Sequence, residues 1–565
     1  MTDVTDATTA RRGPTPDDAL RVADSRREPM LAADGTPLKR SLARALRREK
    51  LRALMLIAPL LLFILVTFIA PIADMLFRSV ENQIVSDTLP RTTRALADWD
   101  GQDLPPEDAF AAMAYDLTEA AELKVHTRLG SRLNYEAPGI SSLFRKSGRG
   151  TGDAGEALGE QFVTLDPAWE NPMVWAELMA PPDWLEARAA HYADGGEPEG
   201  LPAFKLRDEA DTILPETASV YGGFARITQF EDGDDPAEED PWSPIYLALH
   251  RDLAADPPLG DWSGPHADLL AAAAEAAPAM ETVPLVQQFE EIDEDWLDPD
   301  VWATIKTFSP PYTPGYFLNA VDMQQTPDGV ELRPETQRIY VTLFLRTLVM
   351  SLAITGTCLL LGYPVAWLLA NLPSGRANLL MILVLLPFWT SLLVRTSAWK
   401  VLLQQQGVIN DTLVWIGLIA DDKRLTLINN QTGTIIAMTH ILLPFMILPL
   451  YSVMKTIPPS YLRAAKSLGA TDWTAFWRVY FPQSVPGIGA GSILVFILAI
   501  GYYITPELVG GTSGVFISNR IAYHISSSLN WGLAAALGSI LLFAVLILYW
   551  AYDRMVGIDN VKLGG

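Results

Sequence analysis

The residues best suited to chemistry in this chain are a carboxylate and aromatic rings within long apolar runs. Trp389 lies inside one such run, and Tyr502, Tyr503 and Glu507 lie toward the end of another. Ammonium groups are attracted to carboxylates and also to aromatic faces, the latter by about 0.5–2 kcal/mol per contact. We therefore predict that these four residues line a passage for an organic cation, with helix packing and interfacial anchoring as the alternative for each.

Enzymatic chemistry has little support in the sequence. The four histidines of residues 81–340 are isolated, and the acidic run 231–240 lacks the ligand spacing of an EF-hand. No nucleophile elbow and no G-x4-G-K-[ST] loop for ATP phosphates occurs. The single cysteine, Cys358, excludes an internal disulfide. We expect no catalytic residue, metal or cofactor in this chain, so any ATP must be hydrolysed by a partner.

Charged and apolar residues are segregated along the 565 residues. The formal net charge is −24, yet 49% of the residues are apolar and only 19% are charged. Residues 81–340, which we call the acidic segment, hold 50 acidic and 16 basic side chains, whereas the remainder holds 16 acidic and 26 basic ones. A basic remainder with long apolar runs is typical of a membrane protein. No region combines basic clusters with stacking aromatics, so we expect no nucleic-acid partner.

Six apolar runs approach or exceed the length of about 20 residues that a helix needs to cross a bilayer. They are residues 53–73, 343–370, 379–403, 434–451, 487–506 and 531–552. The first run is too long for a signal peptide, and no small-residue cleavage site follows it. The pattern predicts an all-α membrane protein with six transmembrane helices.

The distribution of Lys and Arg among the short loops predicts the topology. Basic residues concentrate before the first run and between the fourth and fifth runs, which places both termini in the cytoplasm and the acidic segment in the periplasm. The predicted regions are a disordered cytoplasmic tail at 1–37, a basic juxtamembrane helix with the first span at 38–80, the acidic segment at 81–340, spans two to six at 341–552, and a cytoplasmic tail at 553–565.

The acidic segment is long enough for a small domain, and its eight tryptophans can supply a core. Helices are expected at 106–124 and 268–277 and a tryptophan-bearing stretch at 296–308, while many prolines predict irregular connections. Two roles stay open: docking or shielding a solute-binding protein over the pore, and concentrating a cationic solute there by its negative field.

The loop at 455–486, which we call the elbow, is predicted to form two short helices. Ser460 is expected to cap the first helix, and Gly469 to take the left-handed position after it. Thr471 or Asp472 is expected to cap the second helix, which is expected to run through about Phe481 and to be ended by Pro482 and Pro486. A rigid, basic elbow on the cytoplasmic side is suited to docking another protein.

The elbow resembles a cytoplasmic loop of the permease subunits of binding-protein-dependent ABC importers, written E-A-A-x3-G-x9-I-x-L-P. The matching positions are Arg463, Ala464, Ala465, Gly469, Val479, Phe481 and Pro482. Arg463 stands where that family has Glu, which removes an acidic group from the expected contact. In that family the loop forms coupling helices that sit in a cleft of the ATPase subunit. The resemblance therefore implies that these residues dock an ABC ATPase, with an amphipathic connector as the alternative.

A narrower resemblance covers about residues 338–560 together with the first span. The stretches 346–370 and 385–410 resemble the B-type permease of spermidine/putrescine importers. It implies the six-helix, MetI-like permease fold, the inner (cytoplasmic) membrane as location, and polyamines or related organic cations as cargo. The implied partners are an ABC ATPase, a second, C-type permease, an extracytoplasmic solute-binding protein and membrane lipid. The acidic segment is an insertion to which the resemblance assigns no function.

Two other classes of function are weighed against this reading. In one, the chain is a membrane-anchored extracytoplasmic sensor or assembly domain, which would not need the elbow. In the other, it is a secondary transporter, which six spans without an intramembrane acid/base relay or an evident internal repeat disfavour.

Overall fold

The computed structural model describes residues 38–556, which are helical apart from their connections and one two-stranded hairpin. The tail expected at 1–37, and the tail at 553–565 from residue 557 on, lie outside the described residues. The chain divides into two compact units, Met1–Met75 and Leu76–Gly565, which are described separately. The expected mostly α-helical architecture is confirmed.

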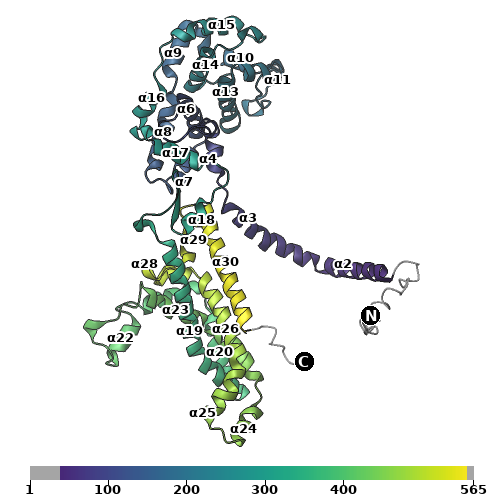
Figure 1. Ribbon diagram of the computed structural model, residues 1–565, viewed down its shortest axis with the longest axis vertical. Helices are drawn as coiled ribbons and strands as arrows, with labels where there is room; N and C mark the ends of the chain where they lie inside the picture. Colours follow the sequence, from purple (N-terminus) through teal and green to yellow (C-terminus); the bar gives the residue numbers. More distant parts are fainter. Residues whose placement is uncertain (1–37, 557–565) are drawn as a thin grey trace, which may run out of the picture. The chain divides into compact units, whose positions relative to one another are not determined.

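One long apolar helix accounts for the described part of the first unit. α2 (Leu38–Ile64) continues through a π-helical turn (Leu65–Ile69) into α3 (Ala70–Arg78), the purple helix of Figure 1. The stretch Lys50–Arg78 is long and apolar enough to cross a membrane, and nearly all of its side chains are exposed. A helix that is apolar on every side requires lipid or another protein around it. The predicted first span, 53–73, lies within this helix.

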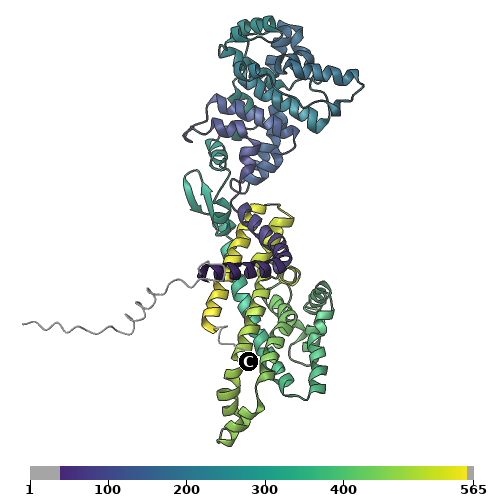
Figure 2. The ribbon, with the colours of Figure 1, turned by 90° about the vertical axis from the view of Figure 1, so that its right-hand side faces the viewer.

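Four further apolar helices pack side by side in the second unit, as the views of Figures 1 and 2 agree. They are α19 (Tyr340–Asn371), α23 (Gln431–Thr456), α26 (Phe481–Gly501) and α30 (Trp531–Val556). Glycines allow α23 and α26 to approach closely. A Cβ atom at Gly487 would lie 3.0 Å from Val453 Cβ, and one at Gly491 would lie 2.8 Å from Met446 Sδ.

The third predicted span, 379–403, is broken rather than straight. α20 (Ser374–Leu385) and a 3-10 turn (Leu386–Trp389) meet α21 (Leu392–Leu402) at an angle of 95°. Pro387 lies in the turn and lacks the N–H that would continue the helix. Among the described residues, five helices are long and apolar enough to span a membrane, or six if this bent pair is one span. α22 (Val408–Trp415) and a 3-10 turn (Asp421–Lys423) lead on to α23.

The fifth predicted span, 487–506, has different bounds in the structure. One apolar helix runs from Asp472 to Gly501, through α25 (Asp472–Ala475), a π-helical turn (Phe476–Tyr480) and α26. After Gly501 the chain forms three short helices before the last span. They are α27 (Ile504–Val509), α28 (Gly511–Gly514) and α29 (Ile517–Ser526). The residues at 502–506 therefore lie outside the long helix.

The acidic segment is built from short helices around a core rich in tryptophan. Its α-helices are α4 (Gln83–Thr88), α5 (Pro90–Ala95), α6 (Glu107–Glu122), α7 (His126–Leu133), α8 (Ile140–Gly150), α9 (Glu156–Leu165), α10 (Pro172–Met179), α11 (Pro182–Ala193), α12 (Asp208–Ile213), α13 (Pro215–Ile227), α14 (Ser243–Ala254), α15 (Ala267–Ala276), α16 (Leu285–Ile292), α17 (Pro299–Thr307) and α18 (Gly315–Ala320). Single 3-10 or π turns link them at Thr151–Asp153, Pro167–Glu170, Pro198–Gly200, Thr228–Asp232, Leu259–Asp261, Ala277–Ala279, Glu294–Leu297 and Glu335–Gln337. The helices predicted at 106–124 and 268–277 correspond to α6 and α15.

Two copies of one structural unit make up most of the acidic segment. The first comprises α4 to α10, and the second comprises α12 to α17. Each begins with a short helix that ends at a leucine before a proline. Leu89 has φ −123° and ψ 54°, and Leu214 has φ −127° and ψ 60°. The chain therefore makes the same turn at the start of both copies.

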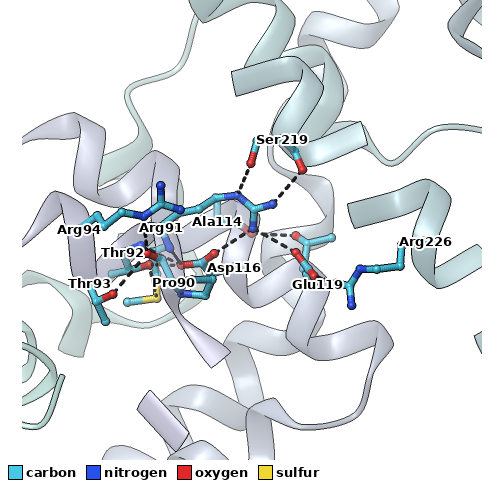
Figure 3. A network of polar contacts seen from close by, with 12 residues as sticks. Pro90, Arg91, Thr92, Thr93, Arg94, Ala114, Asp116, Glu119, Ser219 and Arg226 are labelled. Atoms are coloured by element: carbon cyan, nitrogen blue, oxygen red, sulfur yellow. Dashed lines mark hydrogen bonds and ion pairs between the residues drawn. The ribbon is translucent and has the colours of Figure 1, made fainter. Parts of the chain in front are cut away.

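A buried aspartate holds the next helix at the same place in each copy. Asp116 accepts hydrogen bonds from the backbone N–H and the hydroxyl of Thr92, both at 2.8 Å. Asp252 accepts the same two bonds from Thr217, at 2.7 and 2.6 Å. Figure 3 shows the first copy, where Arg91 also donates to Asp116 at 2.9 Å.

A tryptophan pair closes each copy. The pattern D-x-x-W-x-[DN]-P-x-V-W-A occurs at 166–176 and again at 293–303. The indole N–H of Trp175 donates to the Trp169 carbonyl at 2.9 Å, and that of Trp302 donates to the Trp296 carbonyl at 2.9 Å. All four rings are fully buried, so the prediction of a tryptophan core is confirmed. The recurring motif is therefore a signal for the repeat that the sequence already carries, and the sequence-based expectation of an insertion without a repeat missed it.

Asp322 joins the acidic segment to the second span. Its carboxylate accepts hydrogen bonds from the backbone N–H groups of residues 339–341, at 2.9–3.0 Å, and so caps the first turn of α19. The hairpin of β1 (Met323–Thr326) and β2 (Gly329–Leu332) follows Asp322, and the N–H of Arg333 returns to its carbonyl at 3.0 Å. The helix end and the hairpin are therefore fixed to one buried residue.

Candidate functional site

The elbow has the rigid geometry that its glycine predicts. α24 (Pro459–Ser467) ends in Gly469, which has φ +90°. The N–H of Gly469 donates to Lys466 O at 3.0 Å, and that of Ala470 donates to Ala465 O at 3.1 Å. These two bonds form a Schellman motif, which needs a left-handed residue and therefore favours glycine.

The second helix of the elbow begins as expected but does not end there. The Thr471 hydroxyl accepts from the N–H of Thr474 at 3.2 Å and caps α25. Pro482 and Pro486 both lie inside the long helix instead of stopping it, so that prediction is wrong. The π-helical turn at Phe476–Tyr480 rearranges the hydrogen bonds just before the proline. The elbow is thus a short helix, α24, joined to an extension of the fifth span.

The cap of the first elbow helix also differs from expectation. α24 begins at Pro459, and its N-cap is Pro458, so Ser460 lies within the first turn and does not cap it. Proline is suited to this position because the first helical N–H groups have no partner within the helix. Only the first residue of this helix differs from the prediction, and the positions that match the E-A-A motif are unaffected.

The motif residues of the elbow fall into two environments. Arg463 and Ala464 are exposed and Ala465 is half-buried, so this face of α24 is accessible. Phe481 is half-buried and packs on other rings, with its ring centre 4.8 Å from that of Trp477 and 6.0 Å from that of Tyr363 in α19. Val479 is half-buried, and Pro482 is exposed. The first half of the motif, on α24, is accessible to another protein. In the second half, the ring of Phe481 instead helps to position the elbow against α19.

Large apolar side chains around the elbow are exposed. Leu468 is 89% exposed and Trp473 is 72% exposed, and Tyr461 and Trp477 are also exposed. Lys466 forms an ion pair with Asp472 across the turn between the two helices. Exposed apolar residues gathered on a rigid turn are typical of a protein-binding surface.

The predicted passage residues are only partly brought together. Tyr503 and Glu507 share one turn at the start of α27, where the Asn519 amide donates to the Tyr503 carbonyl at 2.9 Å and to Glu507 Oε2 at 2.6 Å. The Tyr502 carbonyl accepts from the Ser518 hydroxyl at 2.6 Å. Glu507 and Tyr503 are both exposed and lie one helical turn apart.

Trp389 lies apart from that group at the break in the third span. It is 73% exposed at the end of the 3-10 turn, not within a straight helix at mid-span. Within residues 38–556, no hydrogen bond or ring contact joins it to Tyr502, Tyr503 or Glu507. The geometry therefore groups Glu507 with Tyr503 and leaves Trp389 separate.

A polar cluster beside α27 was not predicted as a site. The indole N–H of Trp399 donates to His440 Nδ1 at 3.1 Å, which links α21 to α23. Thr396 and Thr505 join α21 to α27 through their hydroxyls, 3.2 Å apart. Arg395 is half-buried, and its Nε has no hydrogen-bond partner among the described residues. Polar residues within apolar helices were the available signal, since they are costly in a membrane without a function.

The part of the chain that the structure describes has no group of three or more His, Cys, Asp or Glu side chains able to hold a metal ion. Cys358 is fully buried, and its thiol donates to the Thr439 carbonyl at 3.6 Å. The polar groups at α27 are instead carboxylate, amide, hydroxyl and carbonyl acceptors beside aromatic rings. Such a set attracts ammonium groups.

This part of the chain is similar to known transport proteins. Residues 358–556 match the family described as binding-protein-dependent transport system inner membrane component. The spermidine/putrescine transport system permease protein PotB of Escherichia coli (strain K12) is 36% identical over 221 residues, which cover 39% of this chain and 80% of that protein. The PotB of Haemophilus influenzae is 37% identical over 221 residues, covering 39% of this chain and 77% of the relative.

Two further likenesses were found. The inner membrane ABC transporter permease protein YdcU of Escherichia coli (strain K12) is 35% identical over 225 residues, covering 38% of this chain and 71% of that protein. Among solved structures, a bacterial ABC transporter involved in the import of the acidic polysaccharide alginate aligns with 48% of this chain and 99% of its own. That alignment has 22% identity and a TM-score of 0.32.

Proposed function

Because this chain belongs to the family of binding-protein-dependent inner-membrane transport components, we propose that it moves spermidine, putrescine or related organic cations through an ABC importer. It is a multi-pass permease subunit of such an importer. The observation that carries the proposed cargo is the 36% identity to PotB over 80% of that protein's length. The carboxylate and rings at α27 have the chemistry that an organic cation requires.

We propose that the energy comes from an ATPase that docks on the elbow. The chain contains no Walker-type phosphate loop, so a partner must bind and hydrolyse ATP. Arg463, Ala464, Ala465 and Gly469 are assigned to the contact, and Leu468 and Trp473 supply exposed apolar area beside them. Arg463 replaces the family's Glu, so the ATPase surface opposite it is expected to be acidic. Val479, Phe481 and Pro482 are assigned to holding the elbow on α19 and α26.

The remaining assembly follows from the same proposal. A second, C-type permease completes the passage, and an extracytoplasmic solute-binding protein delivers the cation. The elbow and both termini are assigned to the cytoplasm and the acidic segment to the periplasm, which the excess of Lys and Arg in the short loops supports. The exposed faces of α2 and α3 are then covered by lipid or by the other permease.

The passage itself is assigned to the residues around α27. Glu507 is held by Asn519 at 2.6 Å, which fixes its carboxylate beside the exposed Tyr503 ring. A passing ammonium group can contact this carboxylate and ring in turn, and water can solvate it where the long helix ends at Gly501. Tyr502 and Trp389 are assigned to the same passage at separate positions along it.

Reconstitution tests the proposed function. The chain is co-expressed with its neighbouring transport genes, purified as a complex in lipid nanodiscs, and assayed for ATP hydrolysis with spermidine, putrescine or a neutral sugar. Stimulation by the polyamines together with a binding protein, and not by the sugar, is the expected result. Absence of an ATPase from a gently extracted complex overturns the assignment.

Two variants then test the passage in uptake assays. Glu507→Gln removes the charge but retains a hydrogen-bond acceptor for Asn519, and Trp389→Ala removes the exposed ring. Each is expected to lower the apparent affinity for spermidine several-fold. Asp328→Asn, which removes an exposed carboxylate in the hairpin turn, is the matched control and should leave uptake unchanged. Unchanged affinity and rate in both test variants rule out their lining the passage.

A further inference from the structure

A cavity of about 680 Å³ lies where the acidic segment meets the outermost loop of the last two spans. Its walls come from α4, from the end of α6 and the following α7, and from residues 528–532 before and at the start of α30. This volume is within the range of ligand sites, which is about 300–1,000 Å³. The family relatives match only 39% of this chain, so their likeness assigns nothing to a cavity built half from the acidic segment.

Several acceptors in the cavity wall have no partner in the described chain. The side-chain carboxylates of Glu81 and Asp87 form no hydrogen bond or ion pair with any described residue. Asn82 is only 2% exposed, and its amide N–H groups donate to the carbonyls of Phe308 and Pro310 at 2.6 and 3.2 Å. Its Oδ1 is buried without a hydrogen-bond partner. A buried acceptor without a donor is destabilising, and a bound N–H donor removes that cost.

The basic residues of the wall are mostly engaged elsewhere. Arg132 donates to Glu136 at 2.9 Å and to the Tyr316 hydroxyl at 2.8 Å, and its guanidinium lies 4.6 Å from the centre of the Tyr316 ring. Arg78 also has an interaction of its own. Arg128 is the exposed guanidinium that remains. Two unpaired carboxylates and one buried acceptor thus face a single available cation, which favours a positively charged ligand.

Aromatic rings complete the wall. Trp531 is 49% exposed at the start of α30, and the half-buried Tyr135 approaches the adjacent loop, where its hydroxyl donates to the Ser528 carbonyl at 3.4 Å. Leu529, between these two, has φ +53° and is 63% exposed. A left-handed leucine is strained, so the loop is held in a shape that its own sequence disfavours. Ring faces beside carboxylates are the surroundings that ammonium groups prefer.

We propose that this cavity is a holding site for the organic polyammonium solute on the periplasmic side, between its release from the binding protein and its passage between the helices. The proposal rests on the proposed function for the identity of the solute. One ammonium group is assigned to Glu81 and Asp87, and the methylene chain to Trp531 and Leu529. Asn82 Oδ1 accepts from an N–H of the bound solute.

The cavity is also placed to report its occupancy to the membrane part. The Ser528 hydroxyl lies 2.7 Å from His524 Nδ1, and His524 Nε2 lies 2.9 Å from the hydroxyl of Tyr340, at the start of α19. A hydrogen-bonded chain therefore joins the cavity wall to the second span. A solute in the cavity contacts both the acidic segment and the loop at 528–532. These hydrogen bonds connect that loop to Tyr340 at the start of α19.

Binding to the full chain tests the site directly. The chain is purified without partners in nanodiscs of neutral lipid, and spermidine binding is measured by calorimetry at moderate ionic strength. The wild type is expected to bind one spermidine, and the double variant E81Q/D87N is expected to bind at least tenfold more weakly. The control is E331Q/D328N, which removes the same charge from the exposed hairpin and should change affinity less than twofold. Retained folding of each variant is checked by its thermal transition.

The outcomes separate the cavity from the passage and from the transporter assignment. Equal weakening in both double variants shows a general effect of charge and overturns the site. Weakening by E507Q but not by E81Q/D87N places the solute in the passage and likewise overturns it. If the wild type binds no spermidine while the assembled transporter imports it, the cavity fails and the proposed function stands. If the assembled transporter imports no polyamine, the proposed function fails on its own.

Discussion

Replacing Asp322 should loosen the first turn of the second span. Asp322 is 5% exposed, and its two oxygens accept all three N–H groups of residues 339–341. Hydrogen bonds to a charged group contribute about 1.5–3 kcal/mol each, although removing a cap typically costs about 0.5–2 kcal/mol because water replaces part of it. Asp322 also has φ +60°, which costs alanine about 1 kcal/mol. We expect Asp322→Ala to destabilise this turn by about 2–4 kcal/mol.

Asp322→Asn should have a smaller effect for a structural reason. Oδ1 alone accepts from Ile339 and Tyr340, whereas Oδ2 accepts from Val341. Asparagine keeps one acceptor oxygen and tolerates the left-handed conformation, so one bond of three is lost. The expected order of destabilisation is Ala first, then Asn, with Asn costing about 1 kcal/mol.

Hydrogen exchange of the backbone amides in nanodiscs measures this difference. A cost of 2–4 kcal/mol corresponds to about 30- to 700-fold faster exchange at residues 339–341, because each 1.4 kcal/mol is a factor of ten. Asp328→Ala, in the exposed hairpin turn, should leave these amides unchanged. Equal exchange in wild type and Asp322→Ala, or a larger effect of Asn than of Ala, refutes the capping argument.

Three further perturbations have expected results. Burial raises the pKa of Asp116 to about 6 from 3.8, so raising the pH from 4 to 6 should destabilise the acidic segment by about 2 kcal/mol. Asp116→Asn should flatten that dependence in denaturant titrations followed by tryptophan fluorescence. Gly469→Val forces a branched residue into φ +90° and should reduce solute-stimulated ATP hydrolysis several-fold in the assembled transporter, whereas Gly356→Val, a site with open space, should not. Gly491→Leu should clash with Met446 and lower the thermal transition of the purified chain by several degrees; no change would contradict the close packing of α23 on α26.

The pH prediction follows from the sign of the shift. A carboxyl with a raised pKa is protonated more readily in the folded state, so folding is favoured as the pH falls through 6, and the effect is complete only below the ordinary pKa of 3.8. Asp116 accepts from Arg91 and Thr92, which lowers its pKa, but desolvation is the larger cause. Burial also raises the pKa of Asp252, its counterpart in the second copy, so Asp116→Asn is expected to remove only part of the total dependence.

The sequence determined the apolar spans and the elbow because both depend on local patterns. A run such as 53–73 is apolar at every position, whatever surrounds it, and a Gly469 that follows a short helix meets the same left-handed requirement in any fold. The tryptophans of the acidic segment were recognisable as a core because large rings are seldom left in water. These features follow from residue type and spacing alone.

Contacts between distant residues had to come from the tertiary structure. Pro387 is one of several prolines in apolar runs, and its residue type alone does not tell that the helix breaks there while the helix that contains Pro482 continues. Beyond the break, α21 packs against α27. The grouping of Tyr503 with Glu507, without Trp389, depends on Asn519, which lies twelve residues beyond Glu507. The matching aspartate contacts of the two copies, Asp116 with Thr92 and Asp252 with Thr217, join residues that are 24 and 35 positions apart. Periodicity and propensity are local, whereas side-chain bonds across such separations exist only once the chain has folded.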